Sequence, residues 1–179
     1  MRVALLTLGC LACTRPLKLP TAPAPAGESP VRGVLELLLG DSPSIPTVVL
    51  DTTVPVPPLD PGEFIKDFWV DSAIVGFRAA FADLNHRRSG PFRLDSTLVR
   101  GLPLRLVSKR PPQESFRGPT EGLWFVTLSR IGFNTDSTFA VVYSDYYCGS
   151  LCAGAAVFLF ARRPGLRWGR WHTQGLWVS

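Results

Sequence analysis

Histidine is the scarcest of the common metal-binding side chains here. The 179-residue chain has two histidines, His86 and His172, beside four cysteines. Structural zinc takes four protein ligands, usually cysteine and histidine at short, fixed spacings. Neither histidine belongs to such a pair, and two of the cysteines lie in an apolar N-terminal run. The sequence therefore predicts no metal site and no other cofactor.

The common catalytic motifs are missing as well. The chain has no G-x-S-x-G nucleophile elbow and no glycine-rich phosphate loop. A serine triad would require His172 to meet an acid such as Asp145 or Asp136 across a sheet. A lone histidine in a tryptophan-rich strand more often packs or lies on the surface, so His172 is only a weak catalytic candidate. We expect a protein without enzymatic activity.

Long apolar runs are also absent. No segment reaches the eighteen or so uncharged apolar residues that a transmembrane helix needs. The shorter run over residues 3–12 matches the apolar core of a secretory signal. Cys10 and Cys13 at its end resemble the lipidated cysteine of a bacterial lipoprotein signal, although neither has an aliphatic residue three positions before it. We expect residues 1–13 to be an imperfect lipoprotein-type signal modified at Cys13 or Cys10; plain secretion and an N-terminal strand are the alternatives.

Proline and glycine are plentiful, with 17 and 16 residues. Residues 14–30 are rich in proline and alanine, a composition that favours an extended linker over a packed element. We expect this segment to be a tether that holds a single folded domain, residues 31–179, off a membrane. The expected location is the cell envelope, either as a membrane-anchored lipoprotein or as a periplasmic or extracellular protein.

The N-terminal half of the expected domain has helix signals. A serine–proline pair suits the start of a short helix near residues 31–39. Residues 60–63 (Asp-Pro-Gly-Glu) suit a second start, with aspartate as the cap and glutamate completing a capping box. Apolar residues then recur at helical spacing, with a restart at Asp71 and a stop at residues 89–91. Between these two helix starts, residues 47–54 are rich in β-branched residues and predict a strand.

After residue 91 the apolar period changes to two, as in half-buried strands. The strand-like segments are residues 96–107, 123–133, 138–147, 155–163 and 167–179. Short turns join most of them, which indicates an antiparallel meander. Helices followed by a sheet predict an α+β fold with the N-terminal helices packed on one face of a curved antiparallel sheet. A cystatin-like or NTF2-like half-cone is the specific expectation.

Residues 146–154 (YYCGSLCAG) place Cys148 and Cys152 in a turn between two strand segments. Redox-active pairs normally have two intervening residues at a helix start, whereas three separate this pair. Exported proteins meet an oxidising compartment, so we expect a structural disulfide that closes the turn; two packed thiols are the alternative. Gly149 and Gly154 are expected to supply positive φ angles where the hairpin reverses.

Three elements surround this turn in a fixed order. They are an S-x-x-G-F-N element at residues 129–134, an A-x-V-Y element at residues 140–143, and a tryptophan strand at residues 168–171. This order resembles a recurrent group of exported bacterial domains whose turn reads CGxLCGxG, with Ala153 where that group often has glycine. The resemblance covers the C-terminal third of the chain and implies an exported domain; the group offers no catalytic set to carry over to these residues.

Basic residues gather towards the C-terminus. Residues 91–179 carry eleven basic and five acidic side chains, whereas residues 31–90 carry five and eight. Arginine and tryptophan interleave near the end, which suits binding of an anion such as an acidic glycan. The candidate anion-binding residues are Arg162, Arg163, Arg167 and Arg170. We prefer a simple hairpin turn with exposed arginines, because Trp168 and Trp171 would face opposite sides of a regular strand.

The function that these features favour is a non-enzymatic binding or structural module of the cell envelope. Its expected partners are a membrane, through the lipid anchor, and an unidentified envelope protein, glycan or small molecule; a nucleic acid is not expected. The alternatives are an envelope enzyme that uses His172 with nearby acids, and anion binding through residues 162–170.

Overall fold

The protein was analysed as a computed structural model, which describes residues 20–24, 28–40, 46–56, 58–68, 70–87, 91–116 and 123–179. The expected signal at residues 1–13, with its candidate lipidation sites Cys10 and Cys13, lies outside these ranges. The described helices are α1 (Pro30–Leu39), α2 (Pro61–Ile65), α3 (Asp71–Arg87), α4 (Ser96–Val99) and a short 3₁₀ helix, η1 (Gln113–Ser115).

Strands from both halves of the chain form a seven-stranded open sheet. They are β1 (Thr47–Leu50), β2 (Leu104–Val107), β3 (Trp124–Leu128), β4 (Gly132–Phe133), β5 (Phe139–Gly149), β6 (Cys152–Ala161) and β7 (Gly169–Val178). The order is β2-β1-β3-β5-β6-β7, and β4 pairs with β5. β1 runs parallel to both β2 and β3, and the other pairs are antiparallel. The α+β class is confirmed, with a mostly antiparallel sheet.

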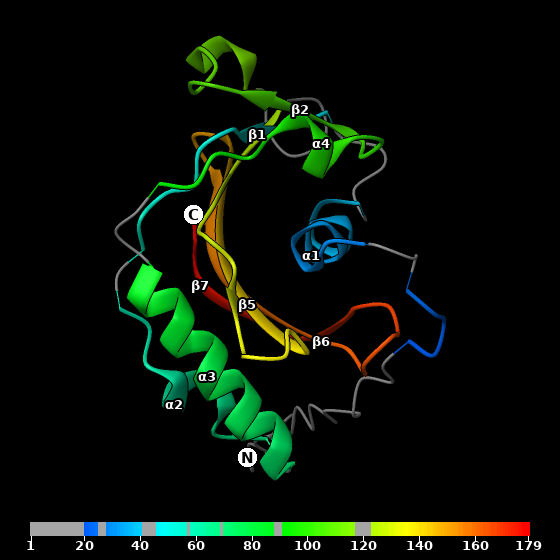
Figure 1. Ribbon diagram of the computed structural model, residues 1–179. Helices are drawn as coiled ribbons and strands as arrows, with labels where there is room; N and C mark the ends of the chain where they lie inside the picture. Colours follow the sequence, from blue (N-terminus) through cyan, green and yellow to red (C-terminus); the bar gives the residue numbers. More distant parts are fainter. Residues whose placement is uncertain are drawn as a thin grey trace, which may run out of the picture.

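Helices cover both faces of this curved sheet, whereas one covered face was expected. α2 and α3 pack on the face that presents Val141, Val157 and Leu159, and α1 packs on the face that presents Val142 and Phe160. In Figure 1 the sheet curves around α1, and α2 and α3 lie outside the curve. The cause lies in β5 and β6, whose apolar runs are nearly continuous. Strands of that composition have two apolar faces to bury.

The expected helix starts are confirmed where the signal is local. The amide of Gly62 donates to Asp60 Oδ1 at 2.9 Å, and Pro61 occupies the first turn of α2. α3 begins at Asp71 and carries His86 and Arg87 in its last turn, where cations complement the helix dipole.

Three strand predictions were too long. The strand expected over residues 47–54 ends at Leu50 in β1. Residues 96–99 form helix α4, because Asp95 Oδ1 accepts from the amides of Thr97 (2.7 Å) and Leu98 (3.2 Å). This helix cap overrides the alternating apolar pattern, and only β2 keeps the strand. Residues 123–133 likewise divide into β3 and β4, separated by three residues outside the ladder.

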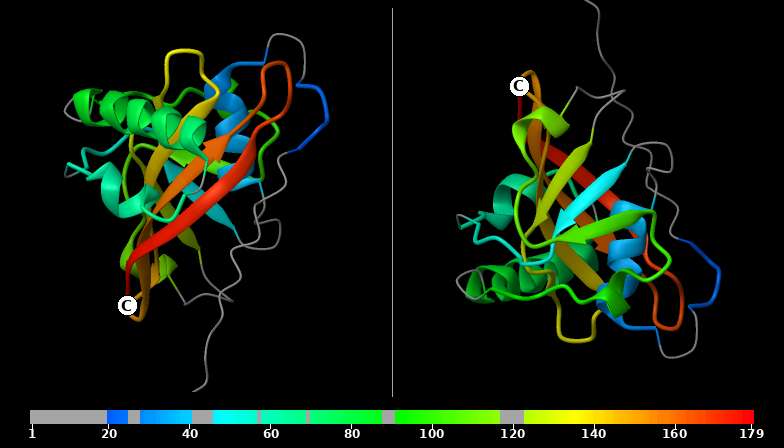
Figure 2. Two further views of the ribbon diagram at one scale, coloured as in Figure 1. Left: turned by 90° about the horizontal axis from the view of Figure 1, so that it is seen from below. Right: turned by 90° about the horizontal axis from the view of Figure 1, so that it is seen from above.

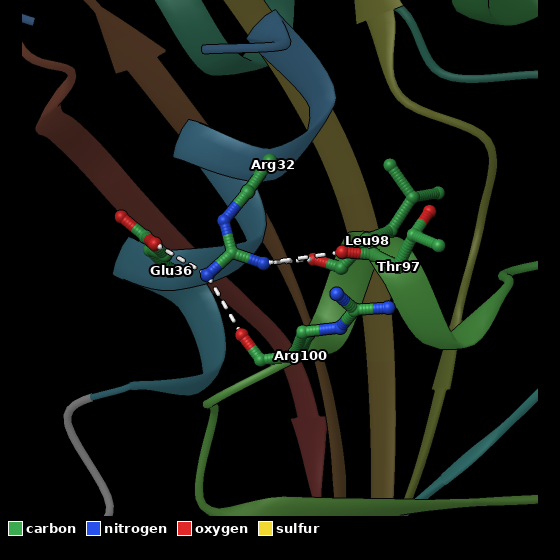
Figure 3. A network of polar contacts seen from close by, with 5 residues as sticks. All are labelled: Arg32, Glu36, Thr97, Leu98 and Arg100. Atoms are coloured by element: carbon green, nitrogen blue, oxygen red, sulfur yellow. Dashed lines mark hydrogen bonds and ion pairs between the residues drawn. The ribbon is translucent and has the colours of Figure 1, made fainter. Parts of the chain in front are cut away.

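Arginine side chains fix α1 at both ends. Figure 3 shows the Arg32 guanidinium donating to the carbonyls of Thr97, Leu98 and Arg100, at 3.3, 3.2 and 2.8 Å, and pairing with Glu36 at 3.0 Å. These carbonyls lie in and just after α4, so α1 and α4 are joined through main-chain acceptors that a helix end leaves available. At the other end of α1, Arg170 Nη2 donates to the carbonyl of Leu37 at 2.8 Å.

Candidate functional site

A cavity of about 620 Å³ lies where the start of α1, the last turns of α3 and the β3–β4 connection meet. Its volume falls within the range of small-molecule sites. The apolar lining residues are Pro30, Val31, Leu35, Ala79, Phe92, Leu94, Leu128, Ile131 and Phe133. The polar lining residues are Thr53, Asp83, Arg87, Ser129, Arg130, Asn134, Thr135 and Ser137.

Close packing of β4 on α3 brings two walls of the cavity together. A Cβ on Gly132 would collide with the carbonyl oxygen of Ala80 and with Leu84, so glycine is required for this approach of strand to helix. Along α3, Ala79, Asp83 and Arg87 are spaced four residues apart and therefore share one side of the helix. That side lines the cavity.

Asp83 connects these two walls. Its Oδ2 accepts from the amide of Phe133 at 3.0 Å, and its Oδ1 pairs with Arg87 Nε at 2.7 Å. Both carboxylate oxygens therefore have a partner. The carboxylate thus positions β4 against α3 and is not left unpaired in the cavity.

The buried hydroxyl groups of the lining are also engaged. Ser129 Oγ accepts from the amide of Tyr143 at 2.9 Å and donates to the carbonyl of Arg130 at 2.7 Å. Thr53 Oγ1 accepts from the amide of Phe92 at 2.8 Å. Because buried polar groups without partners are costly, this bonding fixes the shape of the wall before any ligand binds.

The turn after β4 forms the rim. Asn134 Oδ1 accepts from the amides of Thr138 (2.9 Å) and Phe139 (2.8 Å), and Ser137 has a positive φ of 53°. Thr138 Oγ1 donates to Asp136 Oδ1 at 2.8 Å. This hydroxyl lowers the pKa of the Asp136 carboxyl below its usual value, against a smaller opposing effect of burial. The rim is therefore a tightly hydrogen-bonded loop.

Arg130 differs from the other polar lining residues. Its guanidinium lies 5.4 Å from the ring centroid of Phe92, a cation–π contact between two residues of the lining. Within the described part of the chain, the guanidinium has no hydrogen-bond partner and no ion pair. It is the polar group of the cavity with the most unused donor capacity.

His172 lies in β7 on the face that α2 and α3 cover. Its ring packs edge-on against Phe68, with the ring centroids 5.9 Å apart. The sheet register places His172 opposite Leu159, which is opposite Val141. Asp145 is thus two strands and four residues away, roughly 15 Å.

The second acid proposed for His172 is Asp136, and it is bonded within the rim turn. The structure brings neither carboxylate to His172, and the cavity lining contains neither the histidine nor Asp145.

Two of the four candidate arginines, Arg162 and Arg170, are bonded within the fold. Arg162 Nε donates to the carbonyl of Ser137 at 2.9 Å, and its guanidinium lies 4.8 Å from the ring centroid of Trp168. Arg170 contacts the end of α1, as described above. These two arginines are half-buried and serve the scaffold, whereas Arg163 and Arg167 are exposed.

Trp168 and Trp171 face opposite sides of the sheet, as expected. Trp168 packs with the α1 face and Trp171 with the α3 face. The register shifts between Leu159 and Phe160, which makes Trp171 an extra residue on β7. The two rings therefore do not form a common platform for a ligand.

Part of the expected tether is docked on the domain. Pro23 forms a β-bridge with Leu166, the amide of Ala24 donates to the carbonyl of Gly165 at 3.0 Å, and the amide of Arg167 donates to the carbonyl of Ala22 at 3.0 Å. Figure 2 shows this N-terminal segment in blue beside the β6–β7 loop in orange. Residues 22–24 thus belong to the fold, although their composition predicts a linker.

Cys148 and Cys152 lie at disulfide-bonding distance at the end of the β5–β6 hairpin, with their Cα atoms 5.1 Å apart. Gly149 has the expected positive φ, at 147°. Gly154 has no positive φ; instead, a Cβ there would lie 2.7 Å from the hydroxyl of Tyr146. Glycine at residue 154 therefore makes room for a cross-strand tyrosine ring.

The cavity could not be recognised from the sequence, because its lining comes from five separate stretches of the chain. One signal did point there. Ser129, Phe133 and Asn134, which belong to the S-x-x-G-F-N element, all line the cavity. The motif of the resemblance therefore marks the site better than the cysteine turn does.

No family model, curated protein or solved structure matches the chain. Among the described residues, no group of three or more histidine, cysteine, aspartate or glutamate side chains is placed to hold a metal ion. Within the same residues, no helix has the length and apolar character to cross a membrane.

Proposed function

We propose that the protein is a non-enzymatic binding module of the cell envelope, and that the cavity beside α1 and α3 holds a small ligand. The observation that carries this proposal is the cavity itself. It combines a ligand-sized volume with walls that are fixed by internal hydrogen bonds. Sites of this kind are usually preformed and mostly apolar, with a few polar groups that orient the ligand.

The packing around the cavity supports a binding role. Two walls are bonded to a neighbouring element: α1 to α4 through Arg32, and β4 to α3 through Asp83. The rim turn is held by its own hydrogen bonds to Asn134. A preorganised wall loses little conformational entropy when a ligand binds, which favours affinity. The hydrogen-bonded side chains thus hold the walls of the cavity in place.

Export and a lipid anchor at Cys13 or Cys10 belong to the same proposal, as does membership of the group with the CGxLCGxG turn. Because residues 22–24 are docked on the domain, they limit how far the domain can lie from a lipid anchor. Nine residues lead from Cys13 to Ala22, a reach of at most about 30 Å when fully extended. An anchor at Cys13 would hold the β6–β7 loop, with exposed Arg163 and Arg167, near the membrane surface.

A matched pair of variants tests the proposal. Ala79 and Ala82 are both exposed on α3, but only Ala79 lines the cavity. The unaltered chain purified from cells should carry a bound small molecule, measured by mass spectrometry under non-denaturing conditions. Ala79→Trp should fill the cavity and abolish this binding. Ala82→Trp should retain it. Equal retention by both variants would contradict a ligand role for the cavity.

A further inference from the structure

We infer that the ligand of the cavity has an anionic head group on an apolar body, and that Arg130 binds the head group. This inference rests on the proposed function, because it assigns a ligand class to the same cavity. It follows from which polar groups of the lining are already bonded and which are not.

Four side chains of the lining have their acceptor oxygens bonded within the protein. Both oxygens of Asp83 have partners, and so do the oxygens of Thr53, Ser129 and Asn134. A ligand rich in hydrogen-bond donors would have to break one of these bonds. Exchanging an internal hydrogen bond for one to the ligand yields little net free energy. The lining therefore disfavours a cationic ligand or one rich in hydrogen-bond donors.

The largest unused hydrogen-bonding capacity of the lining is that of its arginine donors. Arg87 uses its Nε on Asp83, and the Arg130 guanidinium has only the Phe92 ring beside it among the described residues. The lining contains two arginines and one aspartate, so its formal charge is positive. A planar guanidinium held over a ring keeps its N–H edge available for a carboxylate or phosphate, which it can bind with two parallel hydrogen bonds.

The rest of the lining specifies the body of the ligand. Leu35, Leu94, Leu128 and Phe133 contribute apolar surface from α1, the segment before α4, β3 and β4. An apolar body is recognised by burial in such a wall and not by directional bonds. The ligand class is therefore a compact organic acid, either a carboxylate or a phosphate monoester.

Three probes with the same bicyclic body separate the head group from the body: 1-naphthoate, 1-naphthyl phosphate and 1-naphthalenemethanol. Each is titrated by calorimetry into the full chain at constant ionic strength. Charge-assisted bonds to arginine should make at least one anion bind about tenfold to a hundredfold more tightly than the alcohol. The stronger of the two anions identifies the head group as carboxylate or phosphate.

Arg130→Gln should remove this preference and leave the affinity for the alcohol unchanged within a factor of about two. Arg163→Gln is the matched control, because Arg163 is an exposed arginine outside the lining; it should keep the preference. Arg130→Lys keeps the charge but loses the planar fork, and should give an intermediate preference.

Two results would overturn the inference in different ways. If the alcohol binds as tightly as both anions, or if Arg163→Gln lowers the preference as much as Arg130→Gln, the head-group assignment is wrong while a binding cavity remains. If none of the three probes binds, or if Ala79→Trp leaves their binding intact, the cavity is not a ligand site and the proposed function fails with the inference.

Discussion

The β5–β6 hairpin has two ends that differ in kind. At the end of β5 and start of β6, Cys148 and Cys152 close a short turn and leave the side chain of Leu151 88% exposed. At the other end, the rim turn before β5 is held by side-chain-to-main-chain hydrogen bonds and borders the cavity. The cysteine end of the hairpin therefore has a structural role, whereas the rim end borders the candidate site.

The difference arises from how each end is built. The cysteine turn is local, because the five consecutive residues 148–152 form it. The cavity is formed by residues that are far apart in the sequence, such as Thr53, Asp83 and Ser129. If this contrast is correct, a change that disrupts the packing of the cavity end should lower both binding and stability, whereas changes at the cysteine end should affect stability alone.

The largest expected effect is that of Gly132→Val. The added side chain would collide with the main chain of α3 and separate β4 from the helix. We expect a loss of about 3 kcal/mol in the free energy of unfolding, since overpacking against main chain cannot relax easily. Urea unfolding followed by circular dichroism measures it, and probe binding should fall in parallel.

Gly175→Ala is the control for that substitution. Gly175 lies in β7, and a Cβ there would meet no atom within 4 Å. Its effect should stay below about 0.5 kcal/mol. Similar losses for the two variants would show that the contact of β4 with α3 is not what maintains the cavity.

Removal of the disulfide should have the next largest effect. The double variant Cys148→Ala, Cys152→Ala should lose about 2 kcal/mol of stability, because the closed loop is short. Its affinity for 1-naphthoate should remain that of the unaltered chain under conditions where both are folded. A loss of affinity without unfolding would couple the two ends and contradict the contrast.

The smallest effect is the pH dependence contributed by Asp136. Its bond from Thr138 lowers the pKa of the carboxyl in the folded state. The unfolded chain therefore takes up the proton first as the pH falls, so the stabilisation is present above about pH 4 and is lost below it. Asp136→Asn should flatten the acid side of the stability profile slightly, whereas Asp67→Asn, at another exposed carboxyl, serves as the reference. Superimposable profiles for the two variants would rule out this role of the rim bond.

Local signals in the sequence predicted local structure well. The start of α2 at Asp60 and Pro61, the restart at Asp71 and the positive φ of Gly149 were all correctly predicted. Each depends on a few adjacent residues, so the sequence contains the cause. Even the error at residues 96–99 is local, because the cap at Asp95 was not weighed against the alternating apolar pattern.

Long-range packing was predicted less well. Continuous apolar runs in β5 and β6 indicate burial of both faces, but not which helix covers each face. The docking of Pro23 on Leu166 depends on main-chain bonds that composition does not indicate. For the same reason the cavity could not be predicted, although the S-x-x-G-F-N element at residues 129–134 marked one wall of it.

The central claim is that the cavity end holds the ligand. The most direct measurement is the amount of small molecule bound per chain in Ala79→Trp relative to Ala82→Trp, determined by native mass spectrometry. We expect Ala79→Trp to lose the bound molecule and Ala82→Trp to retain it. Full occupancy of the Ala79→Trp chain, with its fold intact by circular dichroism, would show that the ligand does not occupy the cavity.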